Sequence, residues 1–199
     1  MYIPKEFIES DIERIISIAN TYAFGMIVTV KEGIPFANHI PLMIDGNEPI
    51  TIYGHMAISN EQWRHFNENT DVLVIYQGPH AYISPSYYEN KGVPTWNYSA
   101  VHMYGKASVI SDKQRTAKLI EDLSHKYEKG KDNPWQPNYS PAALNGIVGF
   151  EIEVERIEAK SKLSQNKPEG DRKKIITSLR NCAGEAESAV AQLMEKNEL

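Results

Sequence analysis

The segment from Val93 to Ile110 carries residues whose types and spacing suggest binding chemistry. Hydrogen-bonding side chains, several of them on flat rings, gather near its start: Thr95, Trp96, Asn97, Tyr98 and His102. The segment is rich in aromatic and β-branched residues, which predicts one long strand. Two interpretations stay open. The strand either contributes to a binding site for a flat, hydrogen-bonding ring, or it turns a polar and aromatic face to solvent or to a second subunit.

A second group, from His55 to Asn60, lies where a strand is expected to lead into a short helix. Ser59 or Asn60 is suited to be the N-cap residue. Free backbone amides and the positive end of the helix dipole can bind a phosphate at such a junction, although most helix starts bind nothing. The basic segment from Lys160 to Lys167 adds positive charge. Together these groups suit a planar heterocycle that carries a phosphate.

Other chemistries lack a supporting motif. The six histidines show no short metal-binding spacing and the single cysteine, Cys182, is distant from them, so we predict no metal site. The sequence contains no nucleophile elbow, no phosphate-binding glycine loop and no dinucleotide fingerprint. No spacing selects a Ser–His–Asp triad, so catalytic residues stay unknown and enzymatic activity stays open.

Composition describes an ordinary globular protein. The 199 residues are 41% apolar and 24% charged, and the net charge of −5 argues against a broad basic surface for nucleic acid. A lone cysteine cannot form an internal disulfide, which fits a reducing compartment. No apolar run approaches the roughly 20 residues of a membrane span. We therefore expect a cytoplasmic protein without membrane segments.

The apolar pattern predicts many strands and few helices. Strands are expected over residues 22–30, 36–44, 49–54, 72–76, 95–110 and 147–157. Helix starts are predicted at two capping boxes, at a serine–proline pair and at an aspartate: Ser10 to Glu13, Ser111 to Gln114, Ser140–Pro141 and Asp171. Pro41 cannot donate to a ladder and must lie at an edge, a bulge or a strand end. We predict a mainly β protein with flanking helices (α+β), built on an antiparallel barrel.

Six short motifs follow one another in an order typical of one family. They are Met1-Tyr2-Ile3-Pro4, His39-Ile40-Pro41-Leu42, Tyr53-Gly54-His55-Met56-Ala57, Gln77 to Pro85, Val93 to Tyr98 with Val101-His102, and Lys162-Leu163-Ser164-Gln165-Asn166. Each motif is weak alone, but six in order between Met1 and about Arg172 are specific. The chain thereby resembles the PaiB-type FMN-binding negative transcriptional regulators of Gram-positive bacteria.

The resemblance implies a six-stranded antiparallel Greek-key split β-barrel of the FMN-binding type, similar in fold to pyridoxamine-phosphate oxidase. It also implies a homodimer with FMN in a cleft between subunits. The backbone of one strand would face the isoalloxazine ring: His39, Pro41 and Leu42. The next segment would meet the ribityl phosphate: His55, Met56, Ala57, Ser59 and Asn60. Two further segments of either subunit would complete the cleft: Thr95, Trp96, Asn97 and Tyr98, and Lys162, Ser164 and Gln165.

The chain departs from the family pattern at one position. Family members have an arginine two residues after the methionine of the third motif, whereas this chain has Ile58. A phosphate that lacks this guanidinium loses a charge-assisted contact worth about 1.5–3 kcal/mol. Arg64, Lys162 and Lys167 are the candidate replacements.

The resemblance further implies a repressor of sporulation genes and of genes for degradative enzymes, with DNA as a candidate partner. The C-terminal segment from Arg172 to Lys196 is the helical pair that could bind DNA, but its charges equally suit a solvent-exposed face. A flavin-dependent oxidoreductase or haem-handling enzyme of the same barrel group is the alternative. We expect residues 1–170 to form the FMN-binding domain and residues 171–199 a helical extension packed on it.

Overall fold

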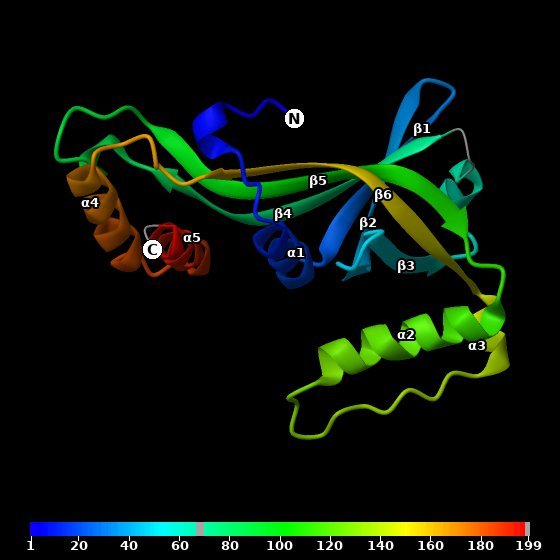
Figure 1. The fold of residues 1–199 in the computed structure, drawn as a ribbon. Coiled ribbons are helices and arrows are strands. Elements are labelled where there is room, and N and C mark those ends of the chain that lie inside the picture. The colour runs from blue at the N-terminus through cyan, green and yellow to red at the C-terminus, as the bar shows by residue number, and fades with distance from the viewer. Residues whose placement is uncertain (67–69, 198–199) are drawn as a thin grey trace. The chain divides into compact units, whose positions relative to one another are not determined.

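The structure, a computed structural model, describes residues 1–66 and 70–197. Its six strands form a closed barrel in the order β1-β2-β3-β6-β5-β4 (Figure 1). The strands are β1 (Phe24–Lys31), β2 (Ile34–Asp45), β3 (Thr51–Ala57), β4 (Asp71–Ile83), β5 (Thr95–Val109) and β6 (Ile147–Lys162). Pairs β1–β2, β1–β4, β2–β3 and β3–β6 are antiparallel. The predicted six-stranded antiparallel barrel with flanking helices is confirmed.

The helices lie before, between and after the strands. The α-helices are α1 (Ile12–Thr21), α2 (Lys113–Glu128), α3 (Pro141–Asn145), α4 (Glu169–Arg180) and α5 (Glu185–Lys196). Three short 3₁₀ helices are η1 (Lys5–Phe7), η2 (Glu61–His65) and η3 (Pro85–Tyr87). In the described part of the chain, every helix is too short or too polar to cross a membrane.

The contacts divide the chain into two compact units. Unit 1 comprises Met1–Ile18, Gln77–His102 and the described residues from Glu158 on, and unit 2 comprises Ala19–Tyr76 and Met103–Ile157. Strands β4, β5 and β6 are long and contribute residues to both units. The boundary that the sequence predicts at residue 170 stays a prediction.

Unit 2 has its core inside the barrel. Large side chains from several strands are fully buried there: Ile27, Leu42, Ile52, Val74, Met103, Phe150 and Ile152. Gly54 leaves room for them, because a Cβ at this position would lie 2.5 Å from Cζ of Phe150 and 2.9 Å from Cδ2 of Leu42. The filled interior means that a ligand of this unit binds elsewhere than inside the barrel.

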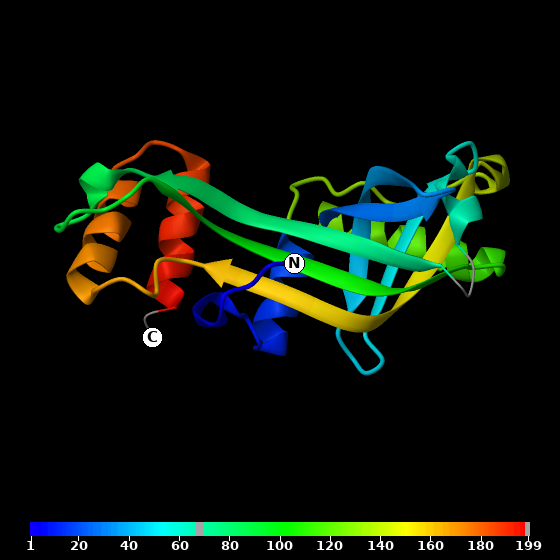
Figure 2. The same cartoon turned by 90° about the horizontal axis from the view of Figure 1, so that it is seen from above.

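Unit 1 has a separate core in which helices pack on strand ends. Its buried side chains come from β4, α4, α5 and the segments beside them: Ala81, Ile83, Tyr88, Leu163, Ile175, Leu179, Val190, Ala191 and Met194. Helices α4 and α5 run side by side (Figure 2), joined through Gly184 at the N-cap of α5. The helical pair that the sequence predicts between Arg172 and Lys196 is confirmed.

Aspartates, rather than the predicted serines, cap the first two helices. Oδ1 of Asp11 accepts from the amide of Glu13 at 3.0 Å, and Oδ1 of Asp112 accepts from that of Gln114 at 2.8 Å. The capping-box interpretation was therefore wrong by one residue in both cases, because an aspartate directly after the serine is an equally good cap. The short helix after Ser140 is confirmed, since its Oγ accepts from Ala143 at 3.2 Å.

Two further details differ from the sequence prediction. The strand predicted to end at Tyr76 continues to Ile83, with Gly78 and Pro79 buried within it. Glycine is needed there, because a Cβ on Gly78 would lie 2.1 Å from Oγ of Ser99. Asp171 does not cap α4; its buried Oδ1 accepts from the amides of Glu89 at 2.8 Å and Asn90 at 3.3 Å.

Candidate functional site

The first group of predicted residues lies where β2 and β3 separate. The two strands pair over residues 42–45 and 51–54. Continued further, this register would set residues 39–41 against residues 55–57. Among the described residues, however, 39–41 pair only with β1 and 55–57 only with β6. Pro41 has no N–H to extend the ladder, which gives a physical reason for its end. We call this opening, bordered by residues 39–41 and 55–57, the β2–β3 split.

A fixed turn closes one end of the split. The amide of Asn60 donates to Ala57 O at 2.9 Å, and the amide of Ile58 donates to Gly146 O at 2.9 Å. Nε1 of Trp63 donates to Ile58 O at 3.0 Å. The side chain of Asn60 caps η2 by accepting from the amide of Gln62, as one of the two predicted alternatives required. The turn is therefore pre-organised before any ligand arrives.

Gln62 anchors the turn to the β1–β2 hairpin. Its side chain is fully buried, and its Nε2 donates to Ile27 O at 2.9 Å and lies within 3.2 Å of Thr29 Oγ1 and Phe36 O. Its Oε1 accepts from Nδ2 of Asn38 at 2.9 Å, and the same Nδ2 contacts Oδ1 of Asn60 at 3.3 Å. This network joins both borders of the split. Gln62 was not predicted from the sequence, because a lone polar residue in a short helix carries no signal of burial.

The predicted residues of this group present different atoms to the split. The side chains of Leu42 and Met56 are 1% and 4% exposed and fill the barrel, so only their backbone can meet a ligand. His39 is exposed, with its ring stacked on Phe24 at 5.8 Å. Ala57 and Ser59 are exposed as well.

His55 carries a buried ring nitrogen that is free to bond to a ligand. Its Nδ1 is buried and has no hydrogen bond within the described residues. Burial lowers the pKa of His55, so the ring is neutral near pH 7. A neutral imidazole at the border of the split can donate to or accept from a bound ligand. This orphaned atom fits a polar cofactor at this position.

The turn supplies neutral donors in place of the absent arginine. Ile58 is 49% exposed and places an aliphatic side chain at the turn. Next to it, the hydroxyl and amide of Ser59 have no acceptor in the described part of the chain, so both can donate to a phosphate. Arg64 is engaged nearby, with Nη1 3.6 Å from Oε1 of Glu61 and the guanidinium 5.3 Å from the ring of Trp63.

The second group of predicted residues forms one interlocked cluster in unit 1. Asn97 is fully buried, and its Nδ2 lies 2.9 Å from Ser164 Oγ and 3.4 Å from Sδ of Met194. The Ser164 hydroxyl in turn donates to Oδ1 of Asn97 at 3.1 Å. Ser164 is 4% exposed and has a φ of +63°, a left-handed conformation that non-glycine residues adopt rarely. Both side chains thus hold the end of β6 on the start of β5.

Lys162 joins the same two segments from the outer side. Its Nζ donates to Oγ1 of Thr95 and to Trp96 O, both at 2.6 Å. Burial lowers the pKa of Lys162, and the positive charges of Lys160 and Lys167 lower it further. The ring of Tyr98 lies 5.2 Å from Nζ of Lys160.

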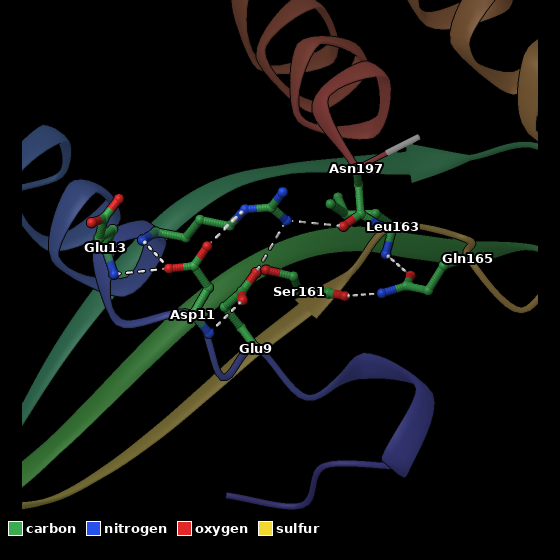
Figure 3. A network of polar contacts seen from close by, with 8 residues as sticks. Glu9, Asp11, Glu13, Ser161, Leu163, Gln165 and Asn197 are labelled. Carbon is green, nitrogen blue, oxygen red and sulfur yellow. Dashed lines mark hydrogen bonds and ion pairs between the residues drawn. The ribbon is translucent and has the colours of Figure 1, made fainter. Parts of the chain in front are cut away.

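The side chain of Gln165 bonds to the backbone of residues just before it in the chain (Figure 3). Its Oε1 accepts from the amide of Leu163 at 2.7 Å, and its Nε2 donates to Ser161 O at 2.5 Å. The side chain of Gln165 is therefore already engaged, as are those of Asn97 and Ser164.

Metal ligands do not gather in this structure. Over residues 1–66 and 70–197, no group of three His, Cys, Asp or Glu side chains is placed to hold an ion. His39 and His55 belong to unit 2, whereas His80 and His102 belong to unit 1.

The fold defines the class of protein. Two solved structures share it. The flavocytochrome Anf3 from Azotobacter vinelandii has a TM-score of 0.65 and 14% identity, and the match covers 80% of this chain and 72% of that chain. An FAD and haem binding protein from Mycobacterium smegmatis has a TM-score of 0.64 and 13% identity, and the match covers 85% of this chain and 78% of that chain. The chain therefore has the split-barrel fold.

The sequence then defines the family. Residues 1–156 match the family model described as "Putative FMN-binding domain". The chain is also 46% identical, over 98% of its length and 97% of the relative's, to "Protease synthase and sporulation protein PAI 2" of Bacillus subtilis. The chain belongs to this FMN-binding family. The predicted resemblance and the predicted cofactor, FMN, are confirmed at the level of the family.

Proposed function

We propose that this protein is a cytoplasmic, FMN-binding homodimer that acts as a negative regulator of sporulation genes and of genes for degradative enzymes. The observation that carries the proposal is the β2–β3 split, bordered by the predicted segments and closed by a pre-organised turn. The name of the Bacillus subtilis relative, which refers to protease synthesis and sporulation, supports the regulatory part.

We assign the flavin to the split. The backbone of His39, Pro41 and Leu42 would face the isoalloxazine ring, because this stretch of β2 has one edge free of β3. The hydroxyl and amide of Ser59 would donate to the phosphate, and the orphaned Nδ1 of His55 would bond to the cofactor's polar tail. FMN supplies the redox-active ring, and the chain supplies orientation and donors.

The predicted cofactor-binding residues in unit 1 have two proposed roles, positioning and direct contact. Asn97 and Ser164 are buried and bond to each other, so they position the segment rather than meet a ligand. Thr95, Tyr98 and Lys162 are half-buried and retain surface for a contact. These residues stay candidates for cofactor binding.

The outer face of β1, β2 and β4 in unit 2 suits the dimer contact. Residues that pair directly share a face of the sheet, and this face is mainly apolar: Phe24 with Pro41, Met26 with His39 and Ile75, Val28 with Ala37 and Leu73, and Val30 with Pro35. Phe24 is 65% exposed and Val30 51%. Monomeric proteins rarely expose so continuous an apolar face, which favours a second subunit as its cover.

The charges of α4 make this helix a poor DNA-binding element. Arg180 binds Glu195 with Nη2 to Oε2 at 2.6 Å, and Lys173 binds Glu169 at 2.5 Å. Nη1 of Arg172 donates to Lys167 O at 2.8 Å. We therefore leave direct DNA contact out of the proposal, and the regulatory effect can act through a partner.

A flavin titration tests the cofactor half of the proposal. Purified protein is titrated with FMN and with riboflavin while flavin fluorescence and sedimentation are followed. We expect saturation at one FMN per chain, weaker binding of riboflavin, and a dimer. Absence of binding of either flavin at micromolar protein would overturn this half.

A genetic complementation tests the regulatory half separately. In Bacillus subtilis that lacks the 46% identical relative, expression of this chain should restore wild-type sporulation and secreted protease levels. If the chain binds FMN but restores neither trait, the cofactor half of the proposal stands and the regulatory half is refuted.

A further inference from the structure

Three aromatic side chains gather on the outer face of unit 1. Tyr82 and Trp96 are 46% and 52% exposed, and their rings lie 6.0 Å apart in an edge-to-face arrangement. The ring of His80, also exposed, lies 6.1 Å from that of Trp96. We call these three residues the aromatic cluster. Exposed aromatic rings that lie together can form a binding surface for another ring.

The cluster stands on a rigid support. The residues that alternate with it on β4, Ala81 and Ile83, are 2% and 0% exposed and belong to the core of unit 1. On β5, Asn97 follows Trp96 and is locked inward by Ser164. Because the inner side chains are fixed, the outer rings are held in place without contributing to the core. A stacking surface of this kind loses little entropy when a flat ligand binds.

Positive charge lies directly beside the cluster. Nζ of Lys162 donates to Trp96 O and to Thr95 Oγ1, which leaves its third N–H without an acceptor in the described part of the chain. Burial lowers the pKa of Lys162, and the positive charges of Lys160 and Lys167 act on the same ammonium group and lower it further. An anion at this position would relieve that repulsion and accept the remaining N–H.

We propose that His80, Tyr82 and Trp96 form a binding site for a planar aromatic acid, whose ring packs against Trp96 and Tyr82 and whose anionic group meets Lys162. The site goes beyond the proposed FMN function: Lys162, a candidate flavin contact in that function, would here meet a small effector distinct from the flavin. Edge-to-face and offset ring contacts supply the stacking, and the lysine supplies the preference for an acid over a neutral ring.

Calorimetric titration with 2-naphthoate tests this site. The full-length protein without flavin is titrated with 2-naphthoate and, separately, with the neutral 2-naphthamide. We expect 2-naphthoate to bind, Trp96→Leu to weaken it about tenfold or more, as expected for loss of a stacked ring, and Lys162→Gln to weaken the acid but not the amide. Equal affinity for acid and amide would overturn the role of Lys162.

A second exposed tryptophan provides the matched control. Trp135 is 48% exposed and lies 5.5 Å from the ring of Tyr139, also edge-to-face, on a segment of unit 2. Trp135→Leu should leave 2-naphthoate binding unchanged. Equal losses in both tryptophan variants would overturn the proposal by showing nonspecific aromatic adsorption.

Two further outcomes separate this site from the proposed function. The titration is repeated with saturating FMN. Retained binding of 2-naphthoate supports a distinct site, whereas displacement by FMN would assign the cluster to the flavin and overturn the effector. Sedimentation of Trp96→Leu must match the wild type, because a change from dimer to monomer would identify the cluster as a subunit contact. Failure of FMN binding alone leaves this site standing.

Discussion

The two regions that hold the predicted cofactor residues are fixed by different interactions. In unit 2, the β2–β3 split exists because a ladder ends beside Pro41, and the chain around it keeps free backbone edges and the free donors of Ser59. In unit 1, side chains bond to side chains, and Asn97, Ser164 and Gln165 have little left to offer a ligand. The comparison indicates that the split binds, while the unit 1 cluster mainly positions Lys162 and the outer rings.

The largest effect is expected where the split depends on one buried side chain. Gln62→Leu keeps about the size of the side chain but removes its hydrogen bonds to Nδ2 of Asn38, to Ile27 O and to Phe36 O. Since each unsatisfied buried group costs about 1–3 kcal/mol, we expect unfolding free energy to fall by about 3 kcal/mol or more. Urea denaturation measures this loss. The exposed Gln136→Leu serves as control, and equal stability of both variants would show that the network does not hold the turn.

The next effect is a gain at the turn. Ile58→Arg adds a guanidinium beside Ser59 at an exposed position, so folding should be unaffected. A charge-assisted contact to phosphate is worth about 1.5–3 kcal/mol, which corresponds to at least about tenfold tighter FMN binding. Fluorescence titration should show this gain for FMN and none for riboflavin. An equal gain for both flavins, or none for FMN, would place the phosphate away from this turn.

A similar but smaller loss is expected in unit 1. Asn97→Leu removes the partner of the buried Ser164 hydroxyl, and we expect unfolding free energy to fall by about 2 kcal/mol. Hydrogen exchange should rise at Ser164 and its neighbours, whereas the amides of the turn from Ala57 to Asn60 should keep their protection. Asn166→Leu, at an exposed position in the same loop, is the control. Loss of protection in the turn would mean that the two regions are not held separately.

The smallest effect concerns pH. Burial lowers the pKa of His55, so below its unfolded pKa of about 6.5 the unfolded chain takes up a proton that the folded chain resists. Stability contributed by His55 is therefore complete above about pH 6.5 and declines as pH falls. His55→Gln should flatten the decline between pH 7 and pH 5, and the exposed His125→Gln should not. If the stability of wild type and of His55→Gln falls equally between pH 7 and pH 5, burial of His55 does not cause the decline.

Much of the fold followed from local pattern, because alternation and turn residues act over a few positions. Strands β1, β2, β3 and β5 were placed within a few residues, β6 was expected to end five residues too early, and Pro41 was expected at an irregular point of pairing. The continuation of β4 through Gly78 was missed, because its cause is a contact with Ser99 on another strand.

The site was predictable in its segments but not in the roles of its side chains. Ordered motifs located both groups, yet nothing local distinguishes a buried Asn97, bonded to Ser164 across 67 positions, from an exposed one. For the same reason Gln62 escaped notice. Long-range hydrogen bonds decide which polar groups stay free for a ligand, and they become visible only in the folded chain.

Hydrogen–deuterium exchange with and without FMN tests whether the flavin binds at the β2–β3 split, because it locates the cofactor on the chain. Residues 38–40 and 57–60 lie at the border of the split and in its turn, and we predict that peptides covering them gain protection when FMN is bound. Segment 130–140, which is part of no predicted flavin contact, should exchange equally in both states. Saturating FMN binding without new protection at either segment of the split would contradict the assignment of the flavin to this site.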